Sequence, residues 1–292
     1  MTAQTPWPRL GRIGIWSLEL RSAPPEEQIA AAAELDELGI PALWIPGGLG
    51  GDVTGDVDRL LTATRNATIA TGIINIWRHE PEDIAAWWQA LPAERQARVL
   101  LGLGVSHGPI IGEAYTKPLA KMAEWLERIT AAGVPPHALC IAALRPRMLA
   151  LAAERTAGSH PYLCDVSHTR ESRAILGPGK LLAPELGAIL ETDRARIRAV
   201  AQAALTMYTG LPNYRDRWLD LGYSEDEIAT CADRFIDGLF ASGTPEQIRA
   251  RAEEHIAAGA DHVCIQVLTD DLAALPIEQW RALAPALTSL SR

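Results

Sequence analysis

The residues of this chain that are best suited to chemistry are two histidines, His79 and His107, each of which closely follows a run of apolar residues. The stretch 98–108 begins with an aliphatic run, continues through Gly102 and Gly104, and reaches His107 just past the apolar part. Glycine permits the close approach of another backbone or of a flat ligand. Histidine ionises near neutral pH and therefore suits proton transfer. The pattern predicts a buried strand with a polar tip; a plain strand that leaves through a glycine-rich turn is the alternative.

A second candidate site is a pair of arginines, Arg145 and Arg147, at the junction between an apolar run and a predicted helix. The N-terminus of a helix attracts anions, and arginine binds phosphate through several N–H groups. The pair therefore indicates a phosphate site. The alternative is that both are solvated surface arginines.

Composition excludes several classes of protein. The chain has 292 residues and a net charge of −9, which argues against non-specific binding of nucleic acid. It has no run of 18 apolar residues, so we expect no transmembrane helix, and residues 1–12 lack the pattern of a signal peptide. We expect a cytoplasmic protein without nucleic-acid or membrane partners. Four cysteines without metal-ligand spacing are expected to be reduced and buried: Cys140, Cys164, Cys231 and Cys264.

An alternation of short apolar runs with amphipathic helices organises the whole chain. Such an alternation predicts parallel strands, and its extent of about 250 residues is typical of a (β/α)8 barrel. We expect one barrel domain over 1–292, interrupted before the last strand by a helical insertion over 209–243, with a helix at 224–240. A doubly wound open sheet is the alternative, but the glycines near the first strand do not match its phosphate-binding fingerprint. The eight predicted strands lie within 12–17, 42–46, 68–77, 98–108, 139–144, 160–164, 181–190 and 262–268.

In a barrel, the residues that follow the strands meet at one end, where the active site lies. His79 and His107 are the residues there that we predict to handle protons. No cluster of histidines and carboxylates has metal-ligand spacing, so we expect no catalytic metal. The chain has no Gly-x-Ser-x-Gly motif, which argues against a serine hydrolase. Other residues predicted to face this end include Ser17, Gly47, Gly48, Asn75, Trp77, His160, Tyr162, Glu185 and Gln266.

Three neighbouring segments carry a resemblance to a known family. They read Ala-Thr-Gly-Ile-Ile at 70–74, Arg-His-Glu-Pro at 78–81 and Val-Leu-Leu-Gly-Leu-Gly-Val-Ser at 99–106. The chain resembles the bacterial luciferase-like monooxygenase superfamily, and more narrowly an actinobacterial subgroup of its coenzyme F420-dependent oxidoreductases. The resemblance extends along nearly the whole length, through 115–122, 158–162, 176–185, 211–214 and 259–266.

The resemblance implies a homodimer of barrels with a deazaflavin (coenzyme F420) or FMN in the mouth of each. In relatives the third strand carries a bulge, often with a non-proline cis peptide, that supports the ring of the cofactor. Here that peptide would fall at Thr71-Gly72 or Gly72-Ile73. The resemblance assigns to the cofactor Thr71, Gly72, Ile73, Val105, Ser106, Arg145 and Arg147, and to the substrate side Trp77, His79, His107, His160 and Tyr162.

Two positions depart from the pattern of the family. F420-dependent sugar-phosphate dehydrogenases have an Asp-His pair after the second strand, where this chain has Gly47 and Gly48, so their proton donor is missing. Many relatives have two glycines after the fifth strand, where this chain has Leu144 and Arg145. The resemblance implies an enzyme that transfers a hydride between F420 and a small unsaturated or carbonyl-bearing substrate. The alternatives are an FMN-dependent monooxygenase and a barrel that binds a flat ligand without turnover.

Overall fold

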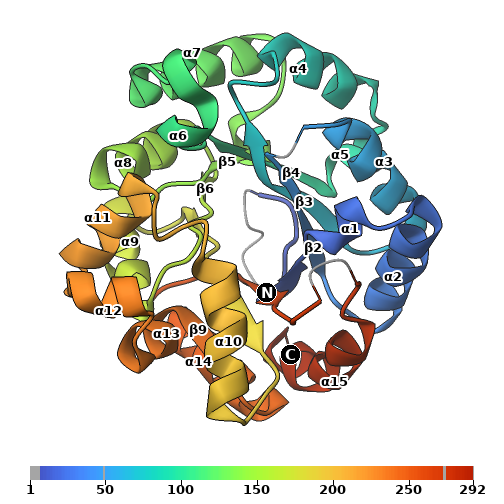
Figure 1. Cartoon of the computed structure of the whole chain (residues 1–292). Helices are drawn as coiled ribbons and strands as arrows, with labels where there is room; N and C mark the ends of the chain where they lie inside the picture. Colours follow the sequence, from blue (N-terminus) through green and yellow to red (C-terminus); the bar gives the residue numbers. More distant parts are fainter. Residues whose placement is uncertain (1–6, 49, 272–273, 292) are drawn as a thin grey trace.

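Parallel strands at the centre of the molecule are surrounded by helices, as Figure 1 shows in a view along the barrel. The computed structural model describes residues 7–48, 50–271 and 274–291. Within these residues ten strands form one sheet, in the order β7-β6-β5-β4-β3-β2-β1-β10-β8-β9. The strands are β1 (Ile13–Trp16), β2 (Ala42–Gly47), β3 (Thr68–Asn75), β4 (Val99–Gly104), β5 (Leu139–Ile141), β6 (Gly158–Ser159), β7 (Leu181–Leu182), β8 (Glu185–Ile189), β9 (Phe240–Ser242) and β10 (Val263–Val267).

The sheet closes into a barrel through the segment that contains β7 and β8. β7 pairs with β6, whereas β8 pairs with β10, which in turn pairs with β1. Only Ala183 and Pro184 separate β7 from β8, and proline interrupts a strand because it has no N–H to donate. The predicted (β/α)8 barrel is therefore confirmed, with β9 as a short additional strand on the free side of β8.

Amphipathic helices follow the strands and cover the outside of the barrel. Several begin with proline in the first turn, and α14 has a capping box formed by Thr244 and Gln247. The helices are α1 (Glu19–Ser22), α2 (Pro25–Glu37), α3 (Val53–Ala63), α4 (Pro81–Ala90), α5 (Ala93–Gln96), α6 (Gly108–Ile111), α7 (Pro118–Ala131), α8 (Pro146–Arg155), α9 (Val166–Leu176), α10 (Arg194–Leu205), α11 (Pro212–Asp220), α12 (Glu225–Thr230), α13 (Asp233–Leu239), α14 (Pro245–Ala257) and α15 (Ile277–Thr288), with 3-10 turns at Gly112–Ala114, Pro136–Ala138 and Ser289–Ser291.

Buried side chains form an inner and an outer apolar layer because successive residues of a strand point to opposite sides. The outer layer lies between the strands and the helices and contains Ile13, Ile15, Leu43 and Ile45. The inner layer fills the barrel, so the barrel is a packed core and not a channel. Its members include Trp16, Trp44, Ala70, Leu100, Cys140, Leu181, Ala183 and Cys264.

The helices α11, α12 and α13 occupy the region predicted as an insertion and pack beside α9 (Figure 1). The indole of Trp218 donates a hydrogen bond to the Leu163 carbonyl at 3.2 Å. The Arg217 guanidinium donates to His168 Nδ1 at 2.9 Å and also pairs with Glu171. These contacts attach the helices to the segment that follows β6.

Three predicted boundaries were wrong. The sixth strand is Gly158–Ser159 instead of 160–164, because residues 160–164 leave the ladder and enter the barrel mouth. The run 181–190 is split into two strands by Pro184. The helix predicted over 224–240 is two short helices, separated where Cys231 adopts a left-handed conformation, and it ends in β9.

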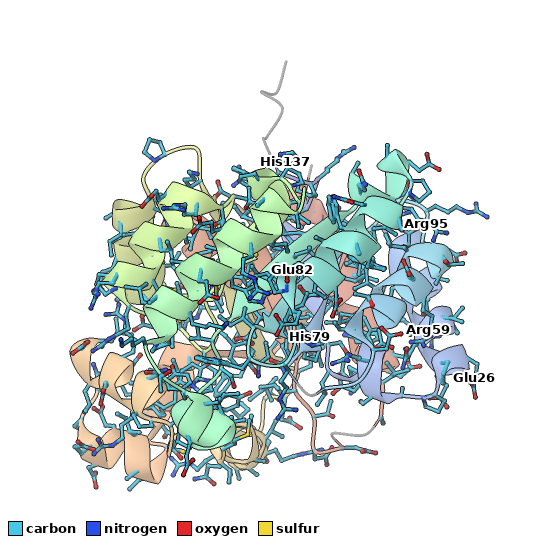
Figure 2. All side chains as sticks on the ribbon, turned by 90° about the horizontal axis from the view of Figure 1, so that it is seen from above. Glu26, Arg59, His79, Glu82, Arg95 and His137 are labelled. Atoms are coloured by element: carbon cyan, nitrogen blue, oxygen red, sulfur yellow. The ribbon has the colours of Figure 1, made fainter. Side chains whose placement is uncertain are left out.

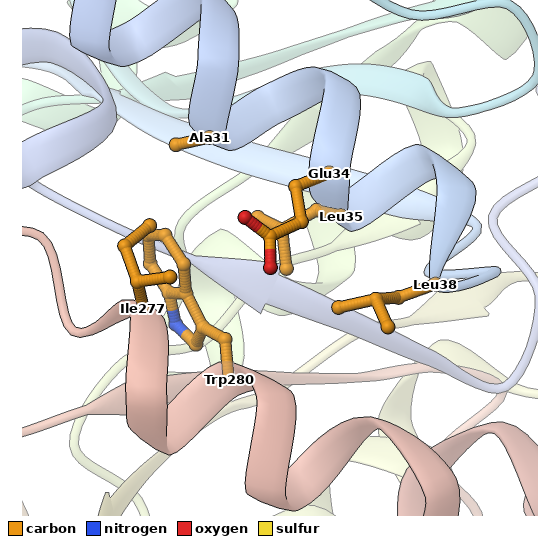
Figure 3. A pocket seen from close by; sticks show the side chains of 6 residues that line it. All are labelled: Ala31, Glu34, Leu35, Leu38, Ile277 and Trp280. Carbon is orange, nitrogen blue, oxygen red and sulfur yellow. The ribbon is translucent and has the colours of Figure 1, made fainter.

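The first and last parts of the barrel meet where α2 packs against α15. Figure 3 shows Leu35 of α2 and Leu38, which directly follows α2, facing Ile277 and Trp280 of α15 around a small hollow that leaves no room for a water molecule. Beside it, Glu34 forms an ion pair with Arg281. This contact is structural packing and offers no space to a ligand. In the described residues no helix is both long and apolar enough to cross a membrane.

Candidate active site

The strand β3 has an irregular backbone halfway along its length. Its pairing register shifts against β2 between Ile45 and Gly47, and against β4 between Ala70 and Ile74. The Gly72–Ile73 peptide bond within this bulge is cis. This is the second of the two positions that the resemblance to luciferase-like proteins indicates.

The Thr71 hydroxyl fastens the bulge to β4. It donates a hydrogen bond to the Gly102 carbonyl at 3.0 Å and accepts one from the Gly102 N–H at 2.8 Å. A Cβ atom at Gly102 would collide with the Thr71 carbonyl oxygen, so only glycine fits there. Thr71 is fully buried and its hydroxyl is satisfied, so this side chain holds the backbone in place and does not face a ligand.

Gly47 packs directly against the same bulge. A Cβ atom at Gly47 would lie 2.9 Å from the Ile73 carbonyl oxygen, whereas the space around a Cβ at Gly48 is open. The backbone of β3 therefore excludes any side chain at Gly47. An aspartate in place of Gly47 would require this backbone to shift.

His160 lies inside the barrel beneath the bulge. Its Nδ1 donates to the Ala183 carbonyl at 2.7 Å, and its ring stacks on Trp44 with 4.3 Å between ring centroids. Its Nε2 faces Gly72, since that atom lies 2.7 Å from the position of a Cβ there. Burial lowers the pKa of His160 to about 4, so the ring is neutral. The structure therefore places His160 among the residues that support the bulge, below Tyr162.

The end of β3 contributes polar groups to the mouth of the barrel. The Asn75 side chain is fully buried; its Oδ1 accepts from the Trp77 N–H at 3.0 Å. The Trp77 indole donates to the Val105 carbonyl at 2.7 Å, which connects β3 to the loop after β4. The Trp77 ring also lies beside Tyr115, with 5.7 Å between centroids. Trp77 and Val105 are thus brought together, as predicted for neighbouring strand ends.

Both predicted catalytic histidines lie at this end of the barrel and are partly buried. In the side view of Figure 2, His137, which precedes β5, lies near the upper end of the barrel, and His79, which follows β3, lies below it. Burial and the nearby Arg21 guanidinium lower the pKa of His79. Burial lowers the pKa of His107, whose ring lies 5.2 Å from that of Tyr214. Both rings are therefore expected to be neutral at pH 7.

A row of aromatic side chains also lies at the mouth and reaches His107 through Tyr214. Tyr162 lies 5.6 Å from Trp16 and 5.6 Å from Tyr208, and Tyr208 meets Tyr214 edge-on at 5.3 Å. The Tyr162 hydroxyl donates to Gln266 Oε1 at 2.8 Å. Trp16, Tyr208 and Tyr214 were not among the predicted site residues, because their approach to the mouth depends on tertiary packing and leaves no local sequence signal.

Glu185, the first residue of β8, places a carboxyl group inside the barrel just below this row. Its Oε2 accepts a hydrogen bond from the Leu163 N–H at 3.1 Å, and the residue is 1 % exposed. Burial raises the pKa of Glu185 to about 8, so the group is protonated at pH 7. The sequence predicted that Glu185 faces this end of the barrel without giving it a role.

Unpartnered buried polar atoms concentrate at the mouth. Nine such side-chain atoms occur within the described ranges, and most native buried polar atoms have a partner. Five of the nine lie at this end of the barrel or in the interior just below it: Asn75 Nδ2, His79 Nε2, His107 Nδ1, His160 Nε2 and Glu185 Oε1. Such a concentration is typical of a site that binds a polar ligand. The described residues contain no group of three His, Cys, Asp or Glu side chains that could hold a metal ion.

The two predicted phosphate-binding arginines diverge in the structure. Arg145 is exposed and forms an ion pair with Asp220 of α11. Arg147 and Lys117 line an open groove of about 720 Å³ between α7 and α8, whose other walls are largely apolar. Ser106 begins the loop that leads toward this groove and has a left-handed backbone with φ of 54°. Arg145 therefore does not line the groove that Arg147 lines, and the two arginines do not form one phosphate site in this structure.

The comparisons with solved structures define the class of fold. The chain has the barrel fold of luciferase-like oxidoreductases and monooxygenases. An F420-dependent secondary alcohol dehydrogenase, solved with an F420-acetone adduct, superimposes with a TM-score of 0.73 at 14 % identity, over 96 % of this chain and 99 % of that one. No sequence-family profile and no curated protein sequence matches the chain.

Two further structures show the range of chemistry found on this fold. The coenzyme F420-dependent tetrahydromethanopterin reductase from Methanopyrus kandleri has a TM-score of 0.70 at 14 % identity, over 97 % of this chain and 100 % of that one. The oxygenating constituent of 3,6-diketocamphane monooxygenase from Pseudomonas putida, in complex with FMN, has a TM-score of 0.70 at 12 % identity, over 96 % and 98 % of the two chains. At such identities the likeness concerns the fold alone.

Proposed function

We propose that this protein is an oxidoreductase that transfers a hydride between coenzyme F420 and a small organic substrate at the mouth of the barrel. The observation that carries the proposal is the set of unpartnered polar atoms of Asn75, His79 and His107, which among the described residues follow or end the neighbouring strands β3 and β4. The fold shared with F420-dependent enzymes supports it. When bound, F420 supplies a ring carbon that gives or accepts the hydride.

The residues beside the bulge fit a flat ring with a carbonyl-bearing edge. The side chain of Ile73 lies against Gly104, and a Cβ atom at Gly104 would come within 2.5 Å of it. Because Gly104 has no side chain, the surface formed by β3 and β4 does not protrude at this point. The Asn75 amide has free N–H groups that can donate to a ring carbonyl. Trp77 and Tyr162 flank this surface and are proposed to line the substrate side, with His79 and His107 handling protons.

The groove between α7 and α8 favours F420 over FMN as the cofactor of this protein. The tail of F420 carries glutamyl carboxylates beyond its phosphate, so it needs a longer and more basic binding surface than FMN. Lys117 and Arg147 supply two positive charges and Glu154 one negative charge to the 720 Å³ groove, which leaves it net positive, and the loop that starts at Val105 and Ser106 leads toward it. We therefore assign the groove to the tail. Arg145, which pairs with Asp220, can take part only if that ion pair opens.

A binding titration tests the proposal directly. The purified protein is titrated with F420 and separately with FMN, and the quenching of ligand fluorescence is followed. We expect micromolar binding of F420 and weaker binding of FMN. Tighter binding of FMN would favour an oxygen-using monooxygenase, the function of the FMN-bound structural neighbour. Absence of binding for both would reject the proposal in favour of a barrel without redox turnover.

A variant of the same shape as Asn75 tests whether the ring of F420 binds beside this residue. Asn75→Asp keeps the oxygen that accepts from Trp77 and replaces the free N–H groups by an oxygen, which would repel a ring carbonyl. We expect affinity for F420 to fall about tenfold to a hundredfold, the range for leaving one buried hydrogen bond unmade. Asn213→Asp, the same change on an exposed residue of α11, is the matched control. Equal affinities for the two variants would place the ring elsewhere.

Two expectations, the homodimer implied by the resemblance and the cytoplasmic location indicated by the composition, remain predictions. The homodimer is tested by light scattering of the purified protein, and the cytoplasmic location by fractionation of the source cells.

A further inference from the structure

Four aromatic side chains form a continuous row at the mouth, and three of them have no role in the proposed chemistry. The row begins at the bulge of β3, where the Trp16 indole donates a hydrogen bond to the Gly72 carbonyl at 3.2 Å. Successive ring centroids lie 5.3 to 5.6 Å apart, and the last ring lies 5.2 Å from that of His107. Two of the rings are only half-buried, so part of their surface is open to a ligand. The aromatic row consists of Trp16, Tyr162, Tyr208 and Tyr214.

Gln266 brings a hydrogen-bonding group to the beginning of this row. It pairs in register with Trp16 of the neighbouring strand, so the two side chains lie on the same face of the sheet. Its Oε1 accepts a hydrogen bond from the Tyr162 hydroxyl at 2.8 Å. Within the described residues its Nε2 has no hydrogen-bond partner, and this atom is not among the fully buried ones. The N–H groups of Gln266 are therefore available to a ligand in the mouth.

We propose that the substrate is an uncharged, flat cyclic compound with a carbonyl group, whose ring packs against the aromatic row and whose carbonyl oxygen accepts a hydrogen bond from Gln266. The inference rests on the proposed oxidoreductase function and specifies the substrate of that site. Aromatic side chains bind flat rings through offset stacking and edge contacts. The Tyr162 hydroxyl holds the Gln266 amide in one orientation, so the donor is in place before the substrate binds.

The charges around the aromatic row favour a neutral substrate. Burial and neighbouring acids, including Glu185 beneath the row, raise the pKa of all three tyrosines of the row. A nearby cation would lower these pKa values. The positive charges of Arg21 and Arg78 act instead on His79, whose pKa they lower. An anionic substrate would therefore find acids and no counter-charge beside the row.

Binding of small probes tests the inference without any turnover. Indanone has a flat bicyclic ring with a carbonyl group, indane lacks the oxygen, and an indanone carboxylate adds a negative charge. Their dissociation constants are measured by saturation-transfer NMR titration, both without F420 and with oxidised F420 present. We expect indanone to bind about threefold to tenfold more tightly than indane, the usual gain from one hydrogen bond. The carboxylate should bind more weakly than indanone.

A variant of Gln266 tests the hydrogen bond to the carbonyl group. Gln266→Glu keeps the oxygen that accepts from Tyr162 and replaces the amide nitrogen by an oxygen, which repels a carbonyl oxygen. We expect its affinity for indanone to fall about tenfold and its affinity for indane to stay within about twofold, so that the preference for the ketone disappears. Gln202→Glu, the same change on an exposed residue of α10, is the matched control.

A variant of Tyr208 tests the contact with the ring. Tyr208→Leu keeps an apolar side chain and removes the aromatic ring from the middle of the row. We expect the affinities for indanone and indane to fall together, by about threefold to tenfold, because both probes lose the same ring contact. Circular dichroism checks that each variant is folded.

The outcomes separate this inference from the proposed function. No binding of indanone, equal binding of indanone and indane by the wild type, tighter binding of the carboxylate, or an unchanged preference in Gln266→Glu would each overturn the inference, even if F420 binds. If the preference for indanone depends on Gln266 but the protein binds no F420, the proposed redox function fails and the recognition of a flat carbonyl compound stands.

Discussion

At the scale of single residues, the candidate site depends on polar groups whose partners are distant in the sequence. Thr71 and Gly102 exchange two hydrogen bonds although 31 positions separate them. Asn75, His79 and His107 bring free polar atoms to the same end of the barrel. The Thr71 hydroxyl, which holds the bulge, has its hydrogen bonds satisfied, whereas Asn75, His79 and His107 each keep one polar atom without a partner, as expected of groups that bind a ligand.

Replacing Thr71 tests the support of the bulge. Thr71→Val keeps the shape and removes both hydrogen bonds to Gly102, leaving a buried N–H and carbonyl without partners. We expect the free energy of unfolding to fall by about 1–3 kcal/mol, measured by urea titration. Thr206→Val, at the exposed residue that follows α10, should change it by less than about 0.5 kcal/mol. Equal effects would show that the Thr71 bonds do not stabilise the fold.

At the scale of elements, close contact between β3 and β4 requires glycine. Gly102→Ala would place a methyl group against the Thr71 carbonyl, which is backbone and cannot rotate away. We expect a loss of about 3 kcal/mol or more in unfolding free energy, or failure to fold. Gly48→Ala enters open space, and its effect should stay within about 0.5 kcal/mol. Thermal denaturation of both variants checks this, and a stable Gly102→Ala would contradict the strand contact.

The attachment of α11 to the barrel depends on one buried tryptophan. Trp218 is fully buried, stacks near Tyr214 and meets Phe235 edge-on at 4.9 Å. Trp218→Ala should cost about 3–5 kcal/mol in unfolding free energy and should speed deuterium uptake over 212–239 more than in the barrel strands.

Trp218→Phe serves as the control for this prediction. It keeps an aromatic ring and loses only the hydrogen bond to the Leu163 carbonyl, so about 1 kcal/mol is expected. Uniform deuterium uptake across the whole chain in Trp218→Ala would show that α11 does not unfold separately from the barrel.

At the scale of the whole molecule, buried ionisable groups set the pH range of stability. Burial lowers the pKa of four histidines to between about 3 and 4, below their ordinary value of 6.5. At a pH between the folded and the unfolded pKa of these histidines, the unfolded chain binds protons that the folded chain does not bind. The free energy of unfolding therefore falls as the pH falls below 6.5. The four are His160, His168, His255 and His262.

Glu185 makes the free energy of unfolding depend on pH in the opposite direction. Its pKa is raised from 4.5 to about 8, so the folded state holds a proton that the unfolded state releases, and stability falls as the pH rises through this window. Urea unfolding at several pH values should show a slope of up to about 1.4 kcal/mol per pH unit for each histidine below pH 6.5.

Two variants isolate these contributions to the pH dependence. Glu185→Gln should remove the decline toward pH 8, because glutamine does not ionise. Replacing the exposed His137 should leave the acid slope unchanged. A stability that does not change between pH 6.5 and the acid range would contradict the burial of the four histidines as neutral rings.

The sequence by itself determined the order and type of most elements. Strand and helix periods are local, and proline or glycine marks many helix ends, so the alternation of β1 to β5 and β10 with helices follows from the chain alone. The prediction from sequence failed where local signals compete. Pro184 breaks a continuous apolar run, and the turn at Cys231 divides a helical pattern. The predicted roles of His79, His107, Trp77 and Tyr162 remain predictions for experiment.

The tertiary structure alone decided how the site is assembled. Barrel closure brings β8 beside β10, which buries Glu185 and aligns it with Cys264, and no spacing in the sequence reports that pairing. The bulge of β3 explains why Gly47 has no side chain. The physical reason is that burial, pKa shifts and unpartnered atoms are properties of contacts between segments distant along the chain, whereas periodicity is a property of neighbours.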